Sequence, residues 1–276
     1  SGAPEGEGRA AFARNEENPL EDDAIIVDEM SMVDMHLFYA LLRACTRGTH
    51  LILIGDAAQL PSVGAGQVLH DLIESGQFPV IALTQIFRQA AESDIVMNAH
   101  RIHAGESIAM GNKSRDFFFL PRNRAEDIIR YLILLIRDKL PAYVNAPSSE
   151  IQVLVPMRRG PLGAETLNRA LQQALNPPAP GKAEWQQGDR LWRVGDKVIQ
   201  TKNDYSASWE VQGYHGIVID QGEGIFNGDL GTITAIDPMA QEITVHFDEN
   251  RLVRVPFAGM EEMDLAYAMT IHKSQG

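Results

Sequence analysis

The stretch AIIVDEMSM, residues 24–32, decides the fold class, because four apolar residues run directly into the adjacent acids Asp28 and Glu29. The run LILIGD, residues 51–56, repeats this pattern of an apolar run that ends in an acid. Short continuous apolar runs are typical of parallel strands that are covered on both faces. The segment 33–45 between them has apolar residues at helical spacing. This alternation of strand and helix predicts an α/β domain with a parallel sheet.

The same alternation continues along the chain and then gives way to a different pattern. Short, alternating, Gly-punctuated strands follow, which predict a small all-β module of the SH3 kind. A sequence pattern typical of helices and parallel strands returns near the C-terminus. We therefore expect this module to be inserted in the second α/β domain. Helices are expected at 33–45, 66–76, 93–105, 125–140 and 163–175, and strands at 24–27, 51–55, 78–83, 116–120 and 151–156. The expected division is a polar lead-in at 1–23, a first domain at 24–83, a second at 84–184 plus 258–276, and the β module at 185–257.

Composition narrows the function classes. The chain has 276 residues and a formal net charge of −13, which argues against a broadly basic nucleic-acid binder but allows a narrow channel lined by a few cations. Its single cysteine, Cys45, excludes an internal disulfide and fits a reducing compartment. No apolar run reaches the roughly 20 residues that a membrane helix needs. We therefore expect a cytoplasmic protein with no membrane contact.

Two strand ends carry the chemistry. A strand that ends in Asp28 and Glu29 places two carboxylates at the carboxyl edge of a parallel sheet, where ligands of open α/β folds bind. In nucleotide hydrolysis one such acid holds Mg²⁺ through water and the other orients or deprotonates the attacking water. The next strand end offers Asp56 and then Gln59, whose amide can sense a terminal phosphate. Either motif alone also suits a helix cap, but both together, in this order, favour a nucleotide site.

Six stretches in order resemble the motifs of RecD-like DNA helicases, which belong to superfamily 1 on its 5′→3′ branch and include the exodeoxyribonuclease V alpha subunit. They are IIVDEMSMVD, LILIGDAAQLPSVGAG, LTQIFRQA, VLVPMRRGPLG, FNGDLGTI and AYAMTIHKSQG. The resemblance covers the chain from residue 12 onward. It implies two RecA-like domains, the first incomplete, with an SH3-like subdomain inserted before the last stretch.

The resemblance also implies which residues surround ATP. It makes Asp28 the Mg²⁺ residue, Glu29 the catalytic base, Gln59 the link between γ-phosphate and DNA, and Arg88 an arginine finger. Arg88 taken on its own would better suit a solvated surface position, and the surrounding motifs favour the arginine finger. A smaller residue is usual in this motif where Met30 stands, and we expect that difference to affect packing alone. The nucleotide-site residues are Asp28, Glu29, Ser31, Asp56, Gln59 and Arg88.

A second group of residues resembles the part of the family that contacts single-stranded DNA. Arg158 and Arg159 follow an expected strand, where they would meet backbone phosphates or lie exposed at a turn. Trp185, Trp192 and Trp209 flank the β module, and we expect them in its core rather than stacked on bases. The residues that resemble the DNA-contacting motif near the domain cleft are Thr270, His272, Lys273 and Gln275.

The implied function is an ATP- and Mg²⁺-dependent helicase that moves on single-stranded DNA, separates duplex DNA and serves recombination and repair. Whether it works alone or with other subunits of a recombination nuclease stays open. The phosphate-binding pattern G-x-x-x-x-G-K-[ST] and the family's final arginine motif do not occur in the chain. We therefore expect a fragment that binds ATP weakly and does not hydrolyse it.

Two other classes remain as alternatives. One is a non-catalytic DNA-binding or scaffolding piece that works through the β subdomain. The other is a Mg²⁺-dependent nuclease, which would need a further carboxylate beside Asp28, with Asp56 as the nearby candidate.

Overall fold

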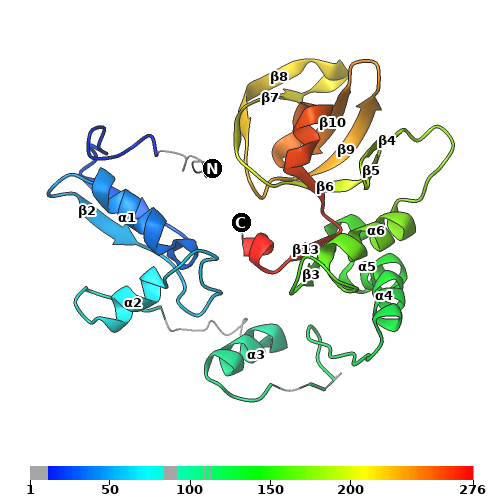
Figure 1. The fold of residues 1–276 in the computed structure, drawn as a ribbon. Helices are drawn as coiled ribbons and strands as arrows, with labels where there is room; N and C mark the ends of the chain where they lie inside the picture. Colours follow the sequence, from blue (N-terminus) through cyan, green and yellow to red (C-terminus); the bar gives the residue numbers. More distant parts are fainter. Residues whose placement is uncertain (1–11, 84–91, 109, 112, 276) are drawn as a thin grey trace, which may run out of the picture. The chain divides into compact units, whose positions relative to one another are not determined.

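The computed structural model describes residues 12–83, 92–108, 110–111 and 113–275, and it divides into two compact units, Ser1–Leu120 and Pro121–Gly276 (Figure 1). Within the described ranges, no helix is both long and apolar enough to cross a bilayer.

The first unit contains the predicted parallel pair of strands. β1 (Ala24–Val27) and β2 (His50–Leu53) run parallel, with Val27 opposite Leu53, which confirms the expected pairing. Asp34 caps α1 (Met35–Ala44), because its carboxylate accepts a hydrogen bond from the Leu37 amide at 2.8 Å. The remaining elements of this unit are η1 (Met30–Met32), α2 (Val68–Glu74) and α3 (Asp94–His103).

The core of the first unit lies on one face of the strand pair. Val27 and Leu53 pack there against Met30, Val68 and Leu69. The opposite face carries exposed Ile26 and Ile52. The expectation that both faces are covered is therefore wrong for the described residues, because side chains alternate along a strand and the helices cover one side alone.

Two predicted strands are not strands in the structure. Residues 78–83 form no strand and pair with none in the described part of the chain, and Ile81 and Leu83 are 91% and 97% exposed. Residues 116–120 also stay outside any sheet, and Asp116 instead accepts a hydrogen bond from the Asp94 amide at 3.0 Å at the start of α3. An apolar run predicts burial, but a strand also needs a neighbour for its backbone groups.

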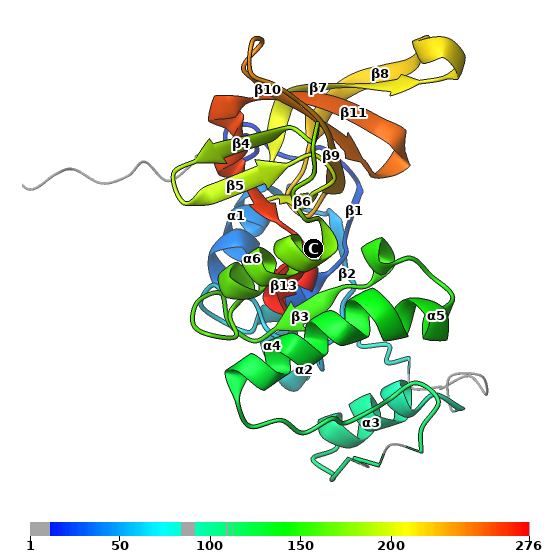
Figure 2. The ribbon, with the colours of Figure 1, turned by 90° about the vertical axis from the view of Figure 1, so that its right-hand side faces the viewer.

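The second unit holds another parallel pair, β3 (Val153–Val155) with β13 (Ala268–Thr270). The long helix expected at 125–140 is present as α4 (Ala125–Leu134), a π-helical turn η3 (Leu135–Lys139) and α5 (Leu140–Val144). α6 (Ala164–Leu175) follows β3. Leu167 and Leu171 of α6 share a buried cluster with Ile136, Val153 and Val155, so helices cover one face of β3, while Leu154 on its other face is exposed (Figure 2).

An antiparallel β subdomain is inserted between β3 and β13. Its seven-stranded sheet has the order β12-β6-β9-β10-β11-β7-β8, and β4 pairs separately with β5 (Figure 1). Because β3 and β13 pair directly although this sheet separates them along the chain, the predicted insertion is confirmed. The strands are β4 (Glu184–Gln187), β5 (Arg190–Arg193), β6 (Lys197–Gln200), β7 (Asp204–Gln212), β8 (Val218–Ile225), β9 (Leu230–Asp237), β10 (Glu242–Phe247), β11 (Arg251–Pro256) and β12 (Met263–Leu265).

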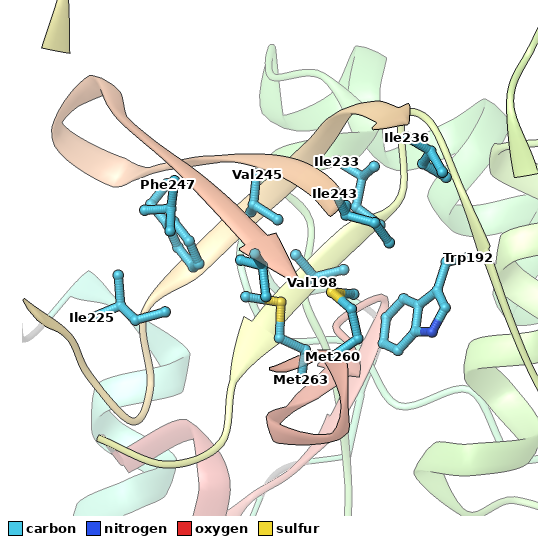
Figure 3. Packing of buried hydrophobic residues seen from close by; sticks show 12 residues of the cluster. Trp192, Val198, Ile225, Ile233, Ile236, Ile243, Val245, Phe247, Met260 and Met263 are labelled. Carbon is cyan, nitrogen blue, oxygen red and sulfur yellow. The ribbon is translucent and has the colours of Figure 1, made fainter. Parts of the chain in front are cut away.

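The core of the β subdomain is dense and apolar. The 3₁₀ segment η7 (Phe257–Glu262) carries Met260 into the sheet, where it lies with Met263 and Trp192 (Figure 3). Trp185 stacks on Phe257 with ring centroids 4.0 Å apart. Trp192 and Trp185 therefore have the packing roles that the sequence predicted.

A buried carboxylate joins the β subdomain to the parallel pair. Asp196 accepts hydrogen bonds from the side chains of Gln172 (2.6 Å), Asn176 (2.7 Å) and Tyr267 (2.9 Å). It also accepts one from the Arg193 amide at 2.7 Å. Burial raises the pKa of Asp196, and these donors oppose that shift. The junction fixes Tyr267, which directly precedes β13, and so positions the residues after that strand.

Candidate functional site

The first candidate site lies at the carboxyl edge of β1 and β2. The parallel ladder continues beyond both strands, because the Ile54 amide donates to the Val27 carbonyl at 2.8 Å and the Met30 amide donates to the Ile54 carbonyl at 2.9 Å. These two bonds hold Asp28 and Glu29 beside the segment that follows β2. The structure thus brings the two predicted motifs to one sheet edge.

Glu29 has an unusual backbone conformation at this edge. Its φ of 54° and ψ of 40° lie in the left-handed region, which non-glycine residues rarely adopt. The Asp28 carboxylate accepts a hydrogen bond from the Glu29 amide at 2.8 Å. Both acids are exposed. Residues in sparsely populated conformations cluster at functional sites, and here the turn presents two neighbouring carboxylates to solvent.

Gly55 allows the two loops to approach each other. A Cβ atom at this position would lie 2.8 Å from Leu69 Cδ2 and 3.1 Å from the Met30 nitrogen. A glycine is therefore needed for close backbone approach rather than for a special φ. Met30 is fully buried, so the expectation that this position affects packing agrees with its surroundings.

Asp56 and Gln59 form a short turn at the same edge. The Asp56 carboxylate accepts a hydrogen bond from the Ala58 amide at 2.9 Å, and the Asp56 carbonyl accepts one from the Gln59 amide at 3.1 Å. The turn fixes where the Gln59 backbone leaves the sheet, and its side chain is exposed. Arg88, the predicted arginine finger, lies outside the described residues.

The donor set at this edge fits a magnesium–nucleotide complex. The Ser31 hydroxyl is buried and has no hydrogen-bond partner within the described ranges. Among the described residues, no three His, Cys, Asp or Glu side chains come together as a metal site. Mg²⁺ bound to a nucleotide needs one or two carboxylates, and water and phosphate oxygens supply the other ligands. The same finding leaves the nuclease alternative without the carboxylate cluster it requires in the part of the chain described.

A second candidate site lies at the carboxyl edge of β3 and β13. Thr270 is opposite Val155, and the Ile271 amide extends the ladder to the Val155 carbonyl at 3.1 Å. The Lys273 amide then donates to the Thr270 hydroxyl at 3.3 Å, at the start of η8 (His272–Gln275). Because Arg158 and Arg159 follow β3 at this same edge, the ladder brings together the two predicted DNA-contacting groups.

Asp264 gathers three cations at this second edge. Its carboxylate lies 3.4 Å from Lys273 Nζ, 3.1 Å from Arg190 Nη2 and 3.9 Å from Arg158 Nη2. Arg158 also donates to Glu165 at 3.0 Å. The sequence prediction missed Arg190 and Asp264, because they lie on β5 and β12, far apart in sequence, and each looks like an ordinary charged residue of a strand.

Lys273 is the most shielded of these cations. Burial lowers the pKa of Lys273, and the neighbouring Asp264 carboxylate opposes that shift. Arg159 is by contrast exposed. Its Nε lies 4.0 Å from Glu165 Oε1, which makes this a long and weak ion pair. The guanidinium and ammonium groups at this edge converge from three separate chain segments. The backbone phosphates of a single DNA strand could therefore contact several of them at once.

Two parts of the chain match known protein families. Residues 10–116 match the family described as "AAA domain", and residues 167–247 match "ATP-dependent RecD-like DNA helicase SH3 domain". The ATP-dependent RecD2 DNA helicase of Deinococcus radiodurans is 36% identical over 98% of this chain and 33% of its own length. The RecBCD enzyme subunit RecD of Mycobacterium tuberculosis is 31% identical over 97% of this chain and 45% of its own length.

The chain thus spans about a third to a half of the length of these curated relatives. Among solved structures, a Pif1 helicase from Bacteroides in complex with ADP-AlF3 and ssDNA matches with a TM-score of 0.49 and 18% identity, over 96% of this chain and 66% of that one. The SH3 match confirms the predicted SH3-like subdomain. With both matches in one chain, and with relatives aligned over nearly its whole length, the chain belongs to the RecD-like helicase family.

Proposed function

We propose that this chain carries the water-activating and DNA-contacting parts of an ATP-dependent DNA helicase that moves on single-stranded DNA. The observation that carries the proposal is the continued ladder between β1 and β2, which holds Asp28 and Glu29 beside the segment leading to Gln59. A RecD2 relative bears the name of an ATP-dependent DNA helicase. The 5′→3′ direction and a role in recombination and repair are part of the same proposal.

Each residue at the first edge has a distinct role in hydrolysis. Asp28 would hold Mg²⁺ through water, and the bound ion would neutralise charge on the phosphates. Glu29 orients the attacking water and accepts its proton. Gln59 contacts the terminal phosphate through its amide, and Ser31 supplies the unpartnered hydroxyl beneath the two acids. Arg88 would stabilise the charge that develops in the transition state.

The second edge binds the DNA strand in this proposal. Thr270, His272 and Lys273 contact the strand from β13 and η8, and Arg158 and Arg159 do so from the end of β3. A limited set of cations suits a motor, because each phosphate that is gripped must also be released. A DNA substrate would place the protein in the cytoplasm. Relatives named as RecBCD subunits suggest other subunits of a recombination nuclease as partners.

We further propose that the 276 residues alone bind ATP weakly and do not turn it over, because backbone amides of a glycine-rich phosphate loop supply much of the affinity in nucleotide sites of this kind. Titration with a fluorescent ATP analogue tests the assignment. Binding should require Mg²⁺ and be lost in Asp28→Asn, whereas the control Glu242→Gln, an acid on β10, should bind like the wild type. Equal binding by both variants would contradict the site, and steady turnover that vanishes in Glu29→Gln would contradict the proposed inactivity.

A further inference from the structure

The β subdomain has a one-sided charge. From Asn203 to Asn250 the chain contains no Lys or Arg in 48 residues, while nine residues are Asp or Glu. This stretch forms β7, β8, β9 and β10 and the turns between them. A surface of this charge repels phosphates and attracts cationic groups. Residues 203–250 are therefore a poor nucleic-acid surface, and the cations of the subdomain lie outside this stretch.

Within the subdomain, β7, β8 and β11 line an open groove of about 850 Å³; these strands are hydrogen-bonded neighbours in the sheet (Figure 2). The carboxylates of Asp204, Glu210, Glu223 and Glu262 line it, against the single guanidinium of Arg254. Arg254 is already bound to Glu210, with Nη2 2.9 Å from Oε1.

The other acids of the groove are not all neutralised. Glu262 lies 3.4 Å from Lys202, which is largely exposed. Asp204 accepts hydrogen bonds from the Ser206 amide and hydroxyl, which hold the pKa of Asp204 below its usual value. Glu223 is exposed on β8. The groove therefore keeps a net negative charge at neutral pH.

The groove also contains a buried acceptor without a donor. Gln200 at the end of β6 lines the groove and is 2% exposed, and its Oε1 has no hydrogen-bond partner in the described part of the chain. A buried acceptor left unpaired destabilises the fold. An N–H donor supplied by a ligand would satisfy it. This second observation points in the same direction as the carboxylates, toward a ligand that brings ammonium or guanidinium groups.

An aromatic ring completes the lining. The Trp209 indole lies over Gly222, where a Cβ atom would come within 2.5 Å of the ring. Trp209 packs against the core of the subdomain, as the sequence predicted, and its partly exposed remainder lines the groove. A cation over an indole face gains further attraction. β8 is the edge strand of the sheet, so its outer backbone groups are open to an extended segment.

We propose that this groove binds an extended segment of a partner protein that carries Lys or Arg side chains. The carboxylates, the indole of Trp209 and the unpaired Gln200 oxygen all favour that ligand over a nucleic acid strand. A second copy of this chain would bring another acidic surface to the same place, which like charge disfavours.

Fluorescence anisotropy with a labelled ten-residue peptide of alternating Lys and Ala, added to the 276-residue chain, tests the proposal. The peptide should bind at physiological salt, and its lysine-acetylated form should not. Glu223→Gln should weaken binding by about two- to five-fold, the range of one exposed charge pair. Glu242→Gln, which removes an acid of the same stretch outside the groove, should leave the affinity unchanged.

A second variant tests the buried acceptor. Gln200→Met keeps the side-chain length but removes the amide, so the melting temperature should hold or rise while peptide affinity falls. Equal losses in Glu223→Gln and Glu242→Gln would show unspecific attraction to an acidic chain and overturn the proposal. Unchanged affinity in Gln200→Met, or a dimer that Glu223→Gln dissolves, would overturn it as well.

Discussion

The ammonium group of Lys273 in η8 lies 3.4 Å from the carboxylate of Asp264 on β12, so an acid of the β subdomain pairs with a cation that the family resemblance assigns to DNA. The same carboxylate also holds Arg190 at 3.1 Å. A phosphate that binds here must compete with Asp264 for these cations. A single substitution of Asp264 should therefore change the positive charge available to a phosphate at this edge.

Removing that competitor should strengthen DNA binding. We expect Asp264→Asn to raise the affinity for oligothymidine at low salt by about two- to five-fold, because a partly exposed ion pair contributes ~0.2–1 kcal/mol. Lys273→Ala should weaken binding and reduce the slope of log affinity against log salt by about 0.7. Anisotropy over a salt series measures both effects. Lys202→Ala, a change to an exposed lysine of the β subdomain, is the matched control, and an equal slope change there would contradict the assignment.

The pKa of Lys273 predicts a pH dependence. Burial lowers it, so Lys273 loses its proton at a lower pH than an ordinary lysine. DNA binding should therefore decline as pH rises into the alkaline range, and it should decline earlier than exposed lysines would cause. Lys273→Arg should keep its affinity over the same range, because a guanidinium stays charged. Parallel decline of the wild type and Lys273→Arg would show that another group controls the profile.

The buried acceptor Asp196 should be important for stability. Each of its oxygens accepts two hydrogen bonds, from Gln172 and Arg193 on one side and from Asn176 and Tyr267 on the other. Asp196→Asn places an N–H₂ group against two of these donors, and we expect a loss of about 2–4 kcal/mol in the free energy of unfolding. Urea unfolding at pH 7 measures it. Asp237→Asn on the surface should cost far less, and an equal cost would contradict the network.

Gly55 gives a test of the loop approach at the first site. Gly55→Val adds atoms where Leu69 and Met30 leave no room, and overpacking of this kind costs about 1–3 kcal/mol. Thermal unfolding should show the loss, together with weaker binding of the ATP analogue. Gly111→Ala is the control, since a Cβ there meets nothing within 4 Å. A Gly55→Val protein with wild-type stability would show that the two loops are farther apart than described.

Much of the fold follows from local pattern, but whether an apolar run finds a strand neighbour does not. β1, β2 and β3 were predictable because apolar runs ended at acids or turns, and Asp34 and Ser93 mark helix starts by a capping hydrogen bond. Residues 78–83 show the same apolar character without a strand neighbour, and sequence alone does not reveal whether a neighbour exists.

The site residues also divide into those that the sequence predicts and those that it does not. Asp28, Glu29, Asp56 and Gln59 were predictable because each follows a strand end, and strand ends of a parallel pair share an edge. Asp264 and Arg190 were not, because their meeting depends on how β5 packs against β12 within the inserted β subdomain. The groove with its unpaired Gln200 depends on the same long-range packing.

The central claim is that the edge formed by Asp28, Glu29 and Gln59 holds a metal–nucleotide complex. Nuclear magnetic resonance of the ¹⁵N-labelled chain with Mn²⁺·ATP tests it most directly, because the paramagnetic ion broadens signals of nearby amides. Our account predicts broadening at the amides of residues 28–31 and 56–59, lost in Asp28→Asn and kept in Glu242→Gln. Broadening centred elsewhere, or equal broadening in Asp28→Asn, would contradict it.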